Sequence, residues 1–367
     1  MNSSFHAGGR LTIDLGALAA NYKTLANLAA PGACGAAVKA DAYGLGIDRV
    51  APALWDAGCR EYFVALPEEA FHLRELLPDA TIYCLGGLTP GGAQDYRSNR
   101  IVPVLNTMDE VDAWARSGKG AASAIHVDTG MNRLGLSLEE AQALVEDRDR
   151  LTATNCQLVM THLACADTPE HPLNAHQVEL FEQVKKLFPN TRASFANSAG
   201  TLLGQPYKSD LSRPGIALYG GASAPVDPNP IRPVVTLEAR IMQVRRAHAG
   251  ETVGYGAAET LKADARLAIL GAGYADGFHR LSGSSDGRPG GSVKLNGASA
   301  PLVGRVSMDL MAADISAPVF DEVQAGDLAT LINEAWTVDN AAAAMETIGY
   351  EVLTSLGRRY QRVYREP

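Results

Sequence analysis

Short apolar runs recur along the first part of the chain, and polar, turn-forming residues follow each of them. The pattern repeats eight times between residues 36 and 216, and most runs lead into a segment whose apolar residues have helical spacing. Alternating β/α units of this kind form a closed parallel barrel when there are eight of them. We therefore predict an N-terminal TIM (β/α)8 barrel. Its strands should end near Lys39, Ala65, Leu85, Val104, Asp128, His162, Ser198 and Ile216.

The amphipathic segments show apolar stripes that face a core. Val178, Phe181, Val184 and Leu187 are spaced three residues apart with charged residues between them, which is typical of a helix packed on a sheet. An earlier segment, 18–28, has the same texture and follows a strand-like run at 11–15. That strand is additional to the eight, so we expect it to pair with the C-terminal domain.

A proline-rich stretch, PVDPNPIRP at 225–233, divides the chain, since neither a helix nor an inner strand tolerates that composition. We predict a barrel domain at 1–224, a linker at 225–233 and a C-terminal domain at 234–367. In the last part, apolar residues alternate with polar ones and turn clusters follow, so this domain should be mainly β. We expect one helix there, around 341–348. The alternating apolar residues are Val235, Leu237, Ala239 and Ile241.

Composition narrows the class of protein. Of the 367 residues, 46% are hydrophobic and 20% charged, as in a folded globular protein, and the formal net charge of −9 argues against nucleic acid. No apolar run is long enough to span a membrane, and the N-terminal ten residues do not resemble an export signal. The five cysteines form no C-x-x-C pair or Cys/His cluster, so we expect reduced thiols, no metal and a cytoplasmic protein.

Candidate chemistry lies at the strand ends, where a barrel of this type holds its active site. Lys39, in AVKADAYGLG, leaves an apolar strand, and desolvation would lower its pKa and make it nucleophilic toward aldehydes. The last two strands end in ANSAG and RPGIALYG, which offer phosphate the Ser198 hydroxyl and the amides of Gly215 and Ile216. A lone lysine at a strand end is more often a surface residue. Together, the two features fit pyridoxal phosphate.

Arg213 ends its strand before the rigid Pro214 and Gly215. A guanidinium is a permanent donor, so next to a pyridine nitrogen it would keep that nitrogen unprotonated. Such a ring is a weaker electron sink, which favours return of a proton over transamination or elimination. The alternative is a structural arginine that bridges strand ends.

Eight motifs in order resemble the alanine racemase family of fold-type III pyridoxal-phosphate enzymes, over nearly the whole chain. They are AVKADAYGLG (37–46), VDTGMNRLG (127–135), THLACAD (161–167), ANSAG (196–200), RPGIALYG (213–220), VGYGA (253–257), GYADG (273–277) and GRVSMDL (304–310).

The resemblance implies a role for each matching residue. Lys39 would be the Schiff-base lysine and one acid/base group, and Tyr255 would be the other. Racemisation needs a base on each face of a planar carbanion, because a proton removed from one side returns on the other. A tyrosine with an ordinary pKa is a poor base, so we expect His162 beside Arg213 to supply positive charge.

The remaining implied roles concern the cofactor, the substrate and the subunit arrangement. Tyr255, Met308 and Asp309 would reach the barrel of the other subunit, which implies a head-to-tail homodimer with shared active sites. Production of D-alanine for peptidoglycan is the commoner use in the family, and degradation is the other. The implied contacts are Tyr43, Ser198, Gly215 and Ile216 with phosphate; His162 and Arg213 with the ring; Arg133, Met308 and Asp309 with substrate; and Asp167, Tyr274, Arg280 and Arg305 at the substrate entrance.

The chain departs from the family pattern at four positions. His126 stands where many members have a lysine that is carbamylated and supports the substrate arginine, and histidine forms no stable carbamate. Arg358 replaces a phosphate-binding tyrosine, a role that either Arg358 or Tyr360 would take. Ser194 and Ser307 replace a frequent histidine and a frequent cysteine.

Three other functions compete with this reading. A non-catalytic pyridoxal-phosphate carrier resembles the first half of the chain but lacks the domain that supplies Tyr255. A fold-type III decarboxylase would carry a C-terminal catalytic cysteine, and no cysteine follows Cys165. A racemase of broader or serine specificity stays open, because pocket size discriminates by only about 1–3 kcal/mol per methylene.

Overall fold

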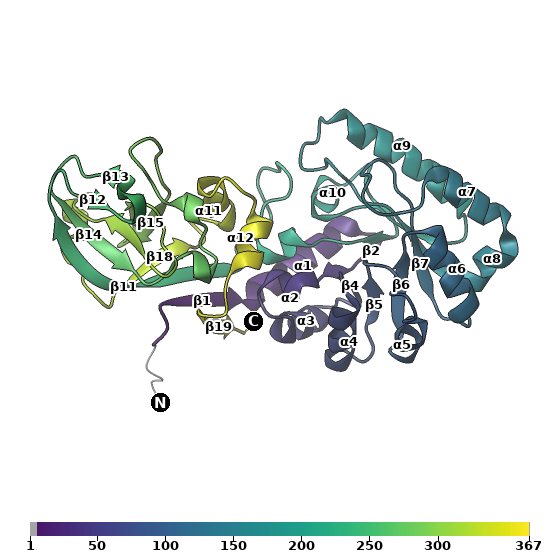
Figure 1. The fold of residues 1–367 in the computed structure, drawn as a ribbon. Coiled ribbons are helices and arrows are strands. Elements are labelled where there is room, and N and C mark those ends of the chain that lie inside the picture. The colour runs from purple at the N-terminus through teal and green to yellow at the C-terminus, as the bar shows by residue number, and fades with distance from the viewer. Residues whose placement is uncertain (1–5, 367) are drawn as a thin grey trace. The chain divides into compact units, whose positions relative to one another are not determined.

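The computed structural model describes residues 6–366, which divide into two compact units (Figure 1). Residues 18–231 form one unit. Residues 6–17 and 232–366 form the other.

The first unit is a parallel barrel, as predicted. Seven strands follow one another in the sheet in chain order, and the eighth, β10, pairs in parallel with β2, which Gly35 separates from β3. The amides of Gly35 and Ala37 donate to the carbonyls of Ser212 and Pro214, each at 2.9 Å, and so close the barrel. The strands are β2 (Ala33–Cys34), β3 (Ala36–Ala37), β4 (Glu61–Val64), β5 (Thr81–Cys84), β6 (Ile101–Leu105), β7 (Ser123–His126), β8 (Cys156–Met160), β9 (Arg192–Ser194) and β10 (Leu211–Ser212).

Helices connect these strands, with their apolar stripes turned inward. In α9, Phe181 and Val184 are buried, and Val178 and Leu187 are half-buried, which confirms the predicted stripe. Several helices begin at a side-chain cap; for example, the Thr107 hydroxyl accepts from the Glu110 amide at 3.2 Å. The helices are α1 (Leu15–Ala29), α2 (Lys39–Tyr43), α3 (Ile47–Asp56), α4 (Pro67–Leu76), α5 (Ala93–Ser98), α6 (Met108–Ser117), α7 (Leu138–Glu146), α8 (Arg148–Thr154), α9 (Pro172–Leu187), α10 (Ser198–Leu203) and the 3-10 turn η1 (Ile216–Tyr219).

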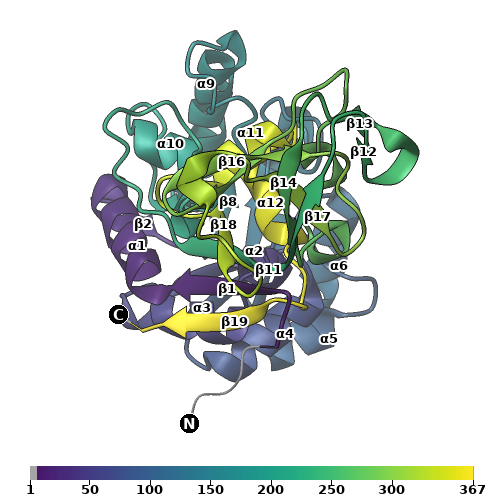
Figure 2. The same ribbon diagram turned by 90° about the vertical axis from the view of Figure 1, so that its left-hand side faces the viewer.

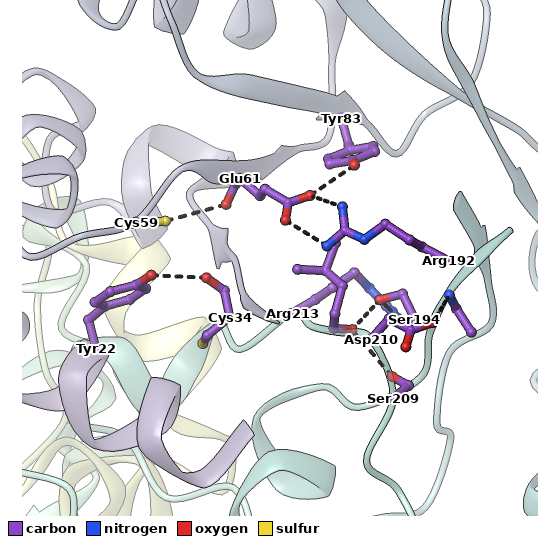
Figure 3. A network of polar contacts seen from close by, with 12 residues as sticks. Tyr22, Cys34, Cys59, Glu61, Tyr83, Arg192, Ser194, Ser209, Asp210 and Arg213 are labelled. Carbon is purple, nitrogen blue, oxygen red and sulfur yellow. Dashed lines mark hydrogen bonds and ion pairs between the residues drawn. The ribbon is translucent and has the colours of Figure 1, made fainter. Parts of the chain in front are cut away.

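An ion pair ties together two strands that are not neighbours in the sheet. Arg192 in β9 donates two hydrogen bonds to the carboxylate of Glu61 in β4, at 2.8 and 3.0 Å, and the Tyr83 hydroxyl donates to the same carboxylate (Figure 3). Glu61 and Arg192 are the first residues of their strands. This end of a barrel serves stability, and the opposite end serves chemistry.

The second unit is built on an eight-stranded sheet in the order β14-β17-β16-β15-β18-β11-β1-β19. The N-terminal strand β1 lies between β11 and β19, antiparallel to the first and parallel to the second (Figure 2). The alternating residues of β11 from Val235 to Ile241 are all buried, as the sequence predicted. The strands are β1 (Gly9–Asp14), β11 (Val235–Ala247), β12 (Thr252–Val253), β13 (Glu259–Thr260), β14 (Ala265–Leu270), β15 (Ser292–Leu295), β16 (Ala298–Val303), β17 (Met311–Asp314), β18 (Leu328–Ile332) and β19 (Gln361–Arg365).

The helix expected around 341–348 is present, but its predicted extent is wrong. The chain forms two short helices, α11 (Val338–Ala344) and α12 (Gly349–Ser355), because Glu346 adopts a positive φ of 55° and interrupts the helical hydrogen bonds. Short 3-10 turns complete the unit: η2 (Tyr255–Ala257), η3 (Tyr274–Asp276), η4 (Arg280–Ser282) and η5 (Pro318–Phe320). Across residues 6–366, no helix has the length and apolar character needed to cross a membrane.

Candidate active site

Lys39 lies just beyond the carboxyl end of β3, at the start of an unusual turn. The four residues after it, Ala40–Tyr43, all have φ between 54° and 56°, and none of them is glycine. A left-handed turn of this kind costs roughly 1–2 kcal/mol per residue, so the surroundings must hold it in place. The Glu69 carboxylate accepts from the Ala40 amide at 2.6 Å, and Asp41 accepts from the Ile47 amide at 2.8 Å. The position of Lys39 is therefore fixed by its neighbours.

The electrostatic environment of Lys39 favours the neutral amine. Its side chain is half-buried, and burial lowers its pKa, with Arg133 acting in the same direction. Glu69 opposes the shift and contributes less. A lysine with a lowered pKa carries more unprotonated amine at neutral pH, which is the form that attacks an aldehyde or takes up a proton.

Arg213 is buried in the barrel, with its guanidinium fixed by polar contacts. Its Nη1 donates to the Ser194 hydroxyl at 2.5 Å (Figure 3). Its Nη2 donates to the Thr161 carbonyl at 2.6 Å. Ser194 in turn donates to the Leu211 carbonyl, so its oxygen is oriented toward Arg213. Burial lowers the pKa of Arg213 to about 9, which leaves it positively charged at pH 7. Arg213 is thus a rigid cationic donor at the barrel mouth.

Two histidines beside Arg213 are neutral. Burial lowers the pKa of both, His126 to about 4, and Arg213 is the next cause in each case. The Arg213 Nη2 lies 3.4 Å from Nδ1 of His162 and can donate to it, which places the proton of that ring on Nε2. The expectation that His162 adds positive charge is therefore wrong. Of His162 and Arg213, only Arg213 carries a positive charge.

A polar cradle forms where β9 and β10 end. The Ser198 hydroxyl accepts from the amides of Gly215 at 2.8 Å and Ala217 at 3.3 Å. Among the described residues, nothing accepts a hydrogen bond from the buried amide of Ile216. A Cβ on Gly215 would lie only 2.1 Å from the Tyr43 hydroxyl oxygen, so glycine is what allows Tyr43 to reach this place. The cradle therefore combines hydroxyls and backbone N–H groups from three segments, as a phosphate site requires.

The charge of this barrel mouth is strongly positive, although the whole protein is acidic. Lys39, Arg133 and Arg213 all lower the pKa of His162. Within residues 6–366, none of these three cations forms an ion pair with a carboxylate. Arg213 is buried, Lys39 is half-buried and Arg133 is exposed, and a group of cations without counter-charges favours an anionic ligand.

Four residues that support this site were not identified from the sequence. Asn106 accepts from His126, Thr161 holds Arg213, and Glu69 holds the turn after Lys39. Asp128 accepts from the amides of Gly130, Met131 and Asn132 and so shapes the loop that carries Arg133. Asn106, Asp128 and Thr161 each follow a barrel strand within two residues, and that position was the available signal.

The other expected residues lie in the second unit, except Asp167, which is exposed in the first. Tyr255 in η2 is 70% exposed, Met308 52% and Tyr274 44%. Asp309, Arg280 and Arg305 are exposed as well.

Tyr360 and Arg358, the two alternatives for a phosphate ligand near the C-terminus, differ in burial. Tyr360 is 4% exposed, and no described residue bonds its hydroxyl. Arg358 is exposed. A buried hydroxyl without a partner is costly, so Tyr360 is the one of the two that requires a ligand or a water molecule.

Comparisons with known proteins cover the whole chain. Residues 13–223 match the family model described as alanine racemase, N-terminal domain, and residues 234–364 match alanine racemase, C-terminal domain. An alanine racemase of Methylobacterium nodulans is 47% identical, over 100% of this chain and 98% of its own length. Agrobacterium fabrum has a catabolic and a biosynthetic alanine racemase that are 45% and 44% identical, over 98% and 97% of this chain and 93% of each relative.

Solved structures agree with the sequence relatives. The crystal structure of alanine racemase from Bartonella henselae, which is described with covalently bound pyridoxal phosphate, matches with a TM-score of 0.92. It is 38% identical, and the match covers 98% of this chain and 100% of that one.

Proposed function

The chain belongs to the alanine racemase family and is an amino-acid isomerase; we propose that Lys39 and, from a second subunit, Tyr255 are its two acid/base groups. The observation that carries the proposal is the environment of Lys39. A half-buried amine with a lowered pKa stands at a barrel mouth whose cations form no ion pair with a carboxylate among the described residues.

The barrel residues fit pyridoxal phosphate. When bound, this cofactor supplies an aldehyde that condenses with amines and a ring that draws electrons from the α-carbon of an amino acid. Lys39 would take the aldehyde, and Arg213 the ring nitrogen. Tyr43, Ser198, Gly215 and Ile216 would hold the phosphate, for which the unused Ile216 amide and the surrounding cations are suited. His162 would lie against the ring, and Arg133 would bind the substrate carboxylate.

Each acid/base group then works on one face of the substrate. Lys39 Nζ removes or returns the α-proton on one side, and Tyr255 Oη does so on the other, so that removal by one group is followed by delivery from the other. Arg213 stays protonated and can only donate, because a guanidinium has no acceptor atom. Its bonds to Ser194 and Thr161 fix its orientation. This arrangement favours the return of a proton to the substrate over side reactions.

Completion of the site requires a second copy of the chain. Tyr255 and Met308 are exposed, and Leu281 and Leu310 of the same unit are 52% and 43% exposed. A head-to-tail homodimer would cover these side chains and bring Tyr255, Met308 and Asp309 to the partner's Lys39. In this dimer, Asp167, Tyr274, Arg280 and Arg305 would line the substrate entrance.

Mixing two inactive variants tests the shared site. Lys39→Ala and Tyr255→Phe each disable both sites of a homodimer, whereas a mixed dimer keeps one site with both groups intact. If the subunits reassort randomly, about a quarter of wild-type activity should return, because half of the dimers are mixed and each has one good site. A site contained in one chain would give no recovery.

Borohydride reduction tests the cofactor assignment separately. In the wild-type holoenzyme, peptide mass spectrometry should find the reduced cofactor on Lys39 alone. Lys39→Ala should carry none, and Lys208→Ala, which removes a half-buried lysine bonded to the Ala30 carbonyl, should behave as wild type. Label on another lysine would contradict the assignment.

We place the reaction in the cytoplasm. All five cysteines are free thiols, which suits a reducing compartment. Supply of D-alanine for peptidoglycan is the commoner role in the family, and we assign that role to this enzyme.

A further inference from the structure

Three motifs of the C-terminal unit meet at one arginine that the proposed mechanism does not use. Arg359 donates through Nε and Nη2 to the two carboxylate oxygens of Asp276, each at 2.7 Å. Its remaining nitrogen, Nη1, donates to Oδ1 of Asp309, also at 2.7 Å. The planar guanidinium thus joins two carboxylates that lie more than thirty residues apart in the chain.

Asp276 anchors one side of this contact. Its side chain is only 6% exposed, and it accepts from the Gly273 amide at 2.9 Å. Its carbonyl accepts from the Gly357 amide at 2.9 Å, which places the segment that carries Arg359 against η3. A buried carboxylate with these bonds is a fixed point for the guanidinium.

Residues 307–310, named here the Met308 loop, form the other side. The amides of Tyr274 and Ala275 donate to the carbonyls of Ser307 and Met308 at 3.1 and 3.0 Å. A Cβ on Gly273 would lie 2.4 Å from each of these carbonyl oxygens, so the two backbones are in direct contact. Beyond this contact the loop is exposed, and the Asp309 side chain is 56% exposed. Among the described residues, Arg359 is the ion-pair partner of Asp309.

We propose that Arg359 is a positioning residue that fixes and neutralises Asp309 at the substrate pocket. The inference rests on the proposed function, in which the Met308 loop lines the site for an amino acid. An amino-acid substrate carries a carboxylate, so an unpaired Asp309 would repel it. Arg359 removes that repulsion and holds the loop in one place, so its loss acts mainly on substrate binding.

Two variants of Arg359 separate positioning from general stability. Arg359→Gln should raise the KM for both alanine enantiomers about tenfold and change kcat less than threefold. Arg359→Lys should keep thermal stability close to wild type, because its charge still faces Asp276, yet leave KM raised, because one ammonium cannot serve both carboxylates in the same geometry. Adding Asp309→Asn to Arg359→Gln should lower KM again, since the unpaired charge is gone.

Arg10→Gln is the matched control. Arg10 makes two bonds to Glu238 in the same unit, at 2.9 and 2.7 Å, and lies in the sheet rather than at the Met308 loop. Arg10→Gln should lower the free energy of unfolding about as much as Arg359→Gln does, and it should leave KM unchanged.

Hydrogen exchange of the full-length holoenzyme gives a readout that does not depend on activity. Arg359→Gln should speed exchange at the amides of Tyr274 and Ala275, and Arg10→Gln should not. A wild-type KM in Arg359→Gln, or unchanged exchange at those amides, would overturn the inference. If the wild-type protein fails to racemise alanine, the proposed function fails, while exchange still decides whether Arg359 holds the loop.

Discussion

His126 donates its Nδ1 proton to Oδ1 of Asn106 across 2.9 Å inside the barrel. The direction is fixed because the Asn106 amide nitrogen donates to the carbonyls of Leu85 and Val104, which leaves its oxygen to accept. A neutral, buried imidazole therefore occupies the position at which the family resemblance implies a lysine that is sometimes carbamylated. Arg133 must be oriented without a carbamate, and Asp128 orders the loop that carries it.

The first prediction is that activity does not depend on bicarbonate. Because His126 cannot form a stable carbamate, kcat/KM should be equal in carbonate-free buffer and in buffer with added bicarbonate. Racemisation rates after exhaustive removal of carbon dioxide provide the measurement. A rate that rises with bicarbonate would show that a lysine elsewhere carries the modification.

The second prediction concerns stability in mild acid. The pKa of His126 is about 4 in the folded protein, against an ordinary value of 6.5, so only the unfolded chain takes up a proton between these values. The free energy of unfolding should therefore fall as pH drops through this window, by about 2 kcal/mol from this group between pH 7 and pH 5. Urea unfolding at both pH values measures the difference.

Variants at two histidines test whether His126 causes the fall in unfolding free energy at mildly acid pH. In His126→Gln, the fall in unfolding free energy between pH 7 and pH 5 should shrink by about 2 kcal/mol. His176→Gln, at an exposed position of α9, is the control. Its unfolding free energy should fall as much between pH 7 and pH 5 as that of the wild type. Equal pH dependence in all three proteins would contradict a neutral, buried His126.

The third prediction tests the phosphate cradle. A Cβ added at Gly215 would lie 2.1 Å from the Tyr43 hydroxyl oxygen, so Gly215→Ala brings the new methyl group against Tyr43. The alanine should push Tyr43 aside and weaken pyridoxal phosphate binding by about tenfold, at a stability cost of about 1–3 kcal/mol. Titration of the apoprotein with the cofactor gives the affinity.

Two further variants make that result specific. Tyr43→Phe should weaken pyridoxal phosphate binding to a similar extent, because it removes the hydroxyl without adding an atom at Gly215. Gly287→Ala, where an added Cβ meets nothing within 4 Å, should leave affinity unchanged. Wild-type affinity in Gly215→Ala would remove Tyr43 and Gly215 from the phosphate site.

The fourth prediction separates the two acid/base groups. With Tyr255→Phe, exchange of the α-proton with solvent should survive far better from one alanine enantiomer than from the other, because Lys39 still serves its own face. Proton NMR in deuterium oxide follows both enantiomers. Equal loss from both would argue against one base on each face.

Much of the barrel could be predicted from the sequence, because its parallel strands are buried on both faces and so form short apolar runs bounded by turns. The end of each apolar run correctly predicted the carboxyl end of a barrel strand. Lys39, Ser198 and Arg213 all lie at that end of the barrel. The turn after Lys39 could not be predicted. Its left-handed residues are alanine, aspartate and tyrosine, and their conformation depends on Glu69, which is distant in the sequence.

Long-range contacts also explain the remaining errors. A histidine expected beside an arginine suggests added positive charge, but the burial that lowers the pKa of His162 appears only in three dimensions. The contact of Arg359 with Asp309 could not be predicted either, because it joins segments that are far apart in the sequence. The break between α11 and α12 was missed because Glu346, rather than glycine or proline, interrupts the helix.

The most direct test of the account is circular dichroism of L-alanine incubated with the cofactor-loaded protein, with L-serine beside it. The account predicts that the alanine signal decays to zero, and much faster than the serine signal. With Lys39→Ala, the alanine signal should not decay. An unchanged alanine signal from protein that has bound pyridoxal phosphate would contradict the account.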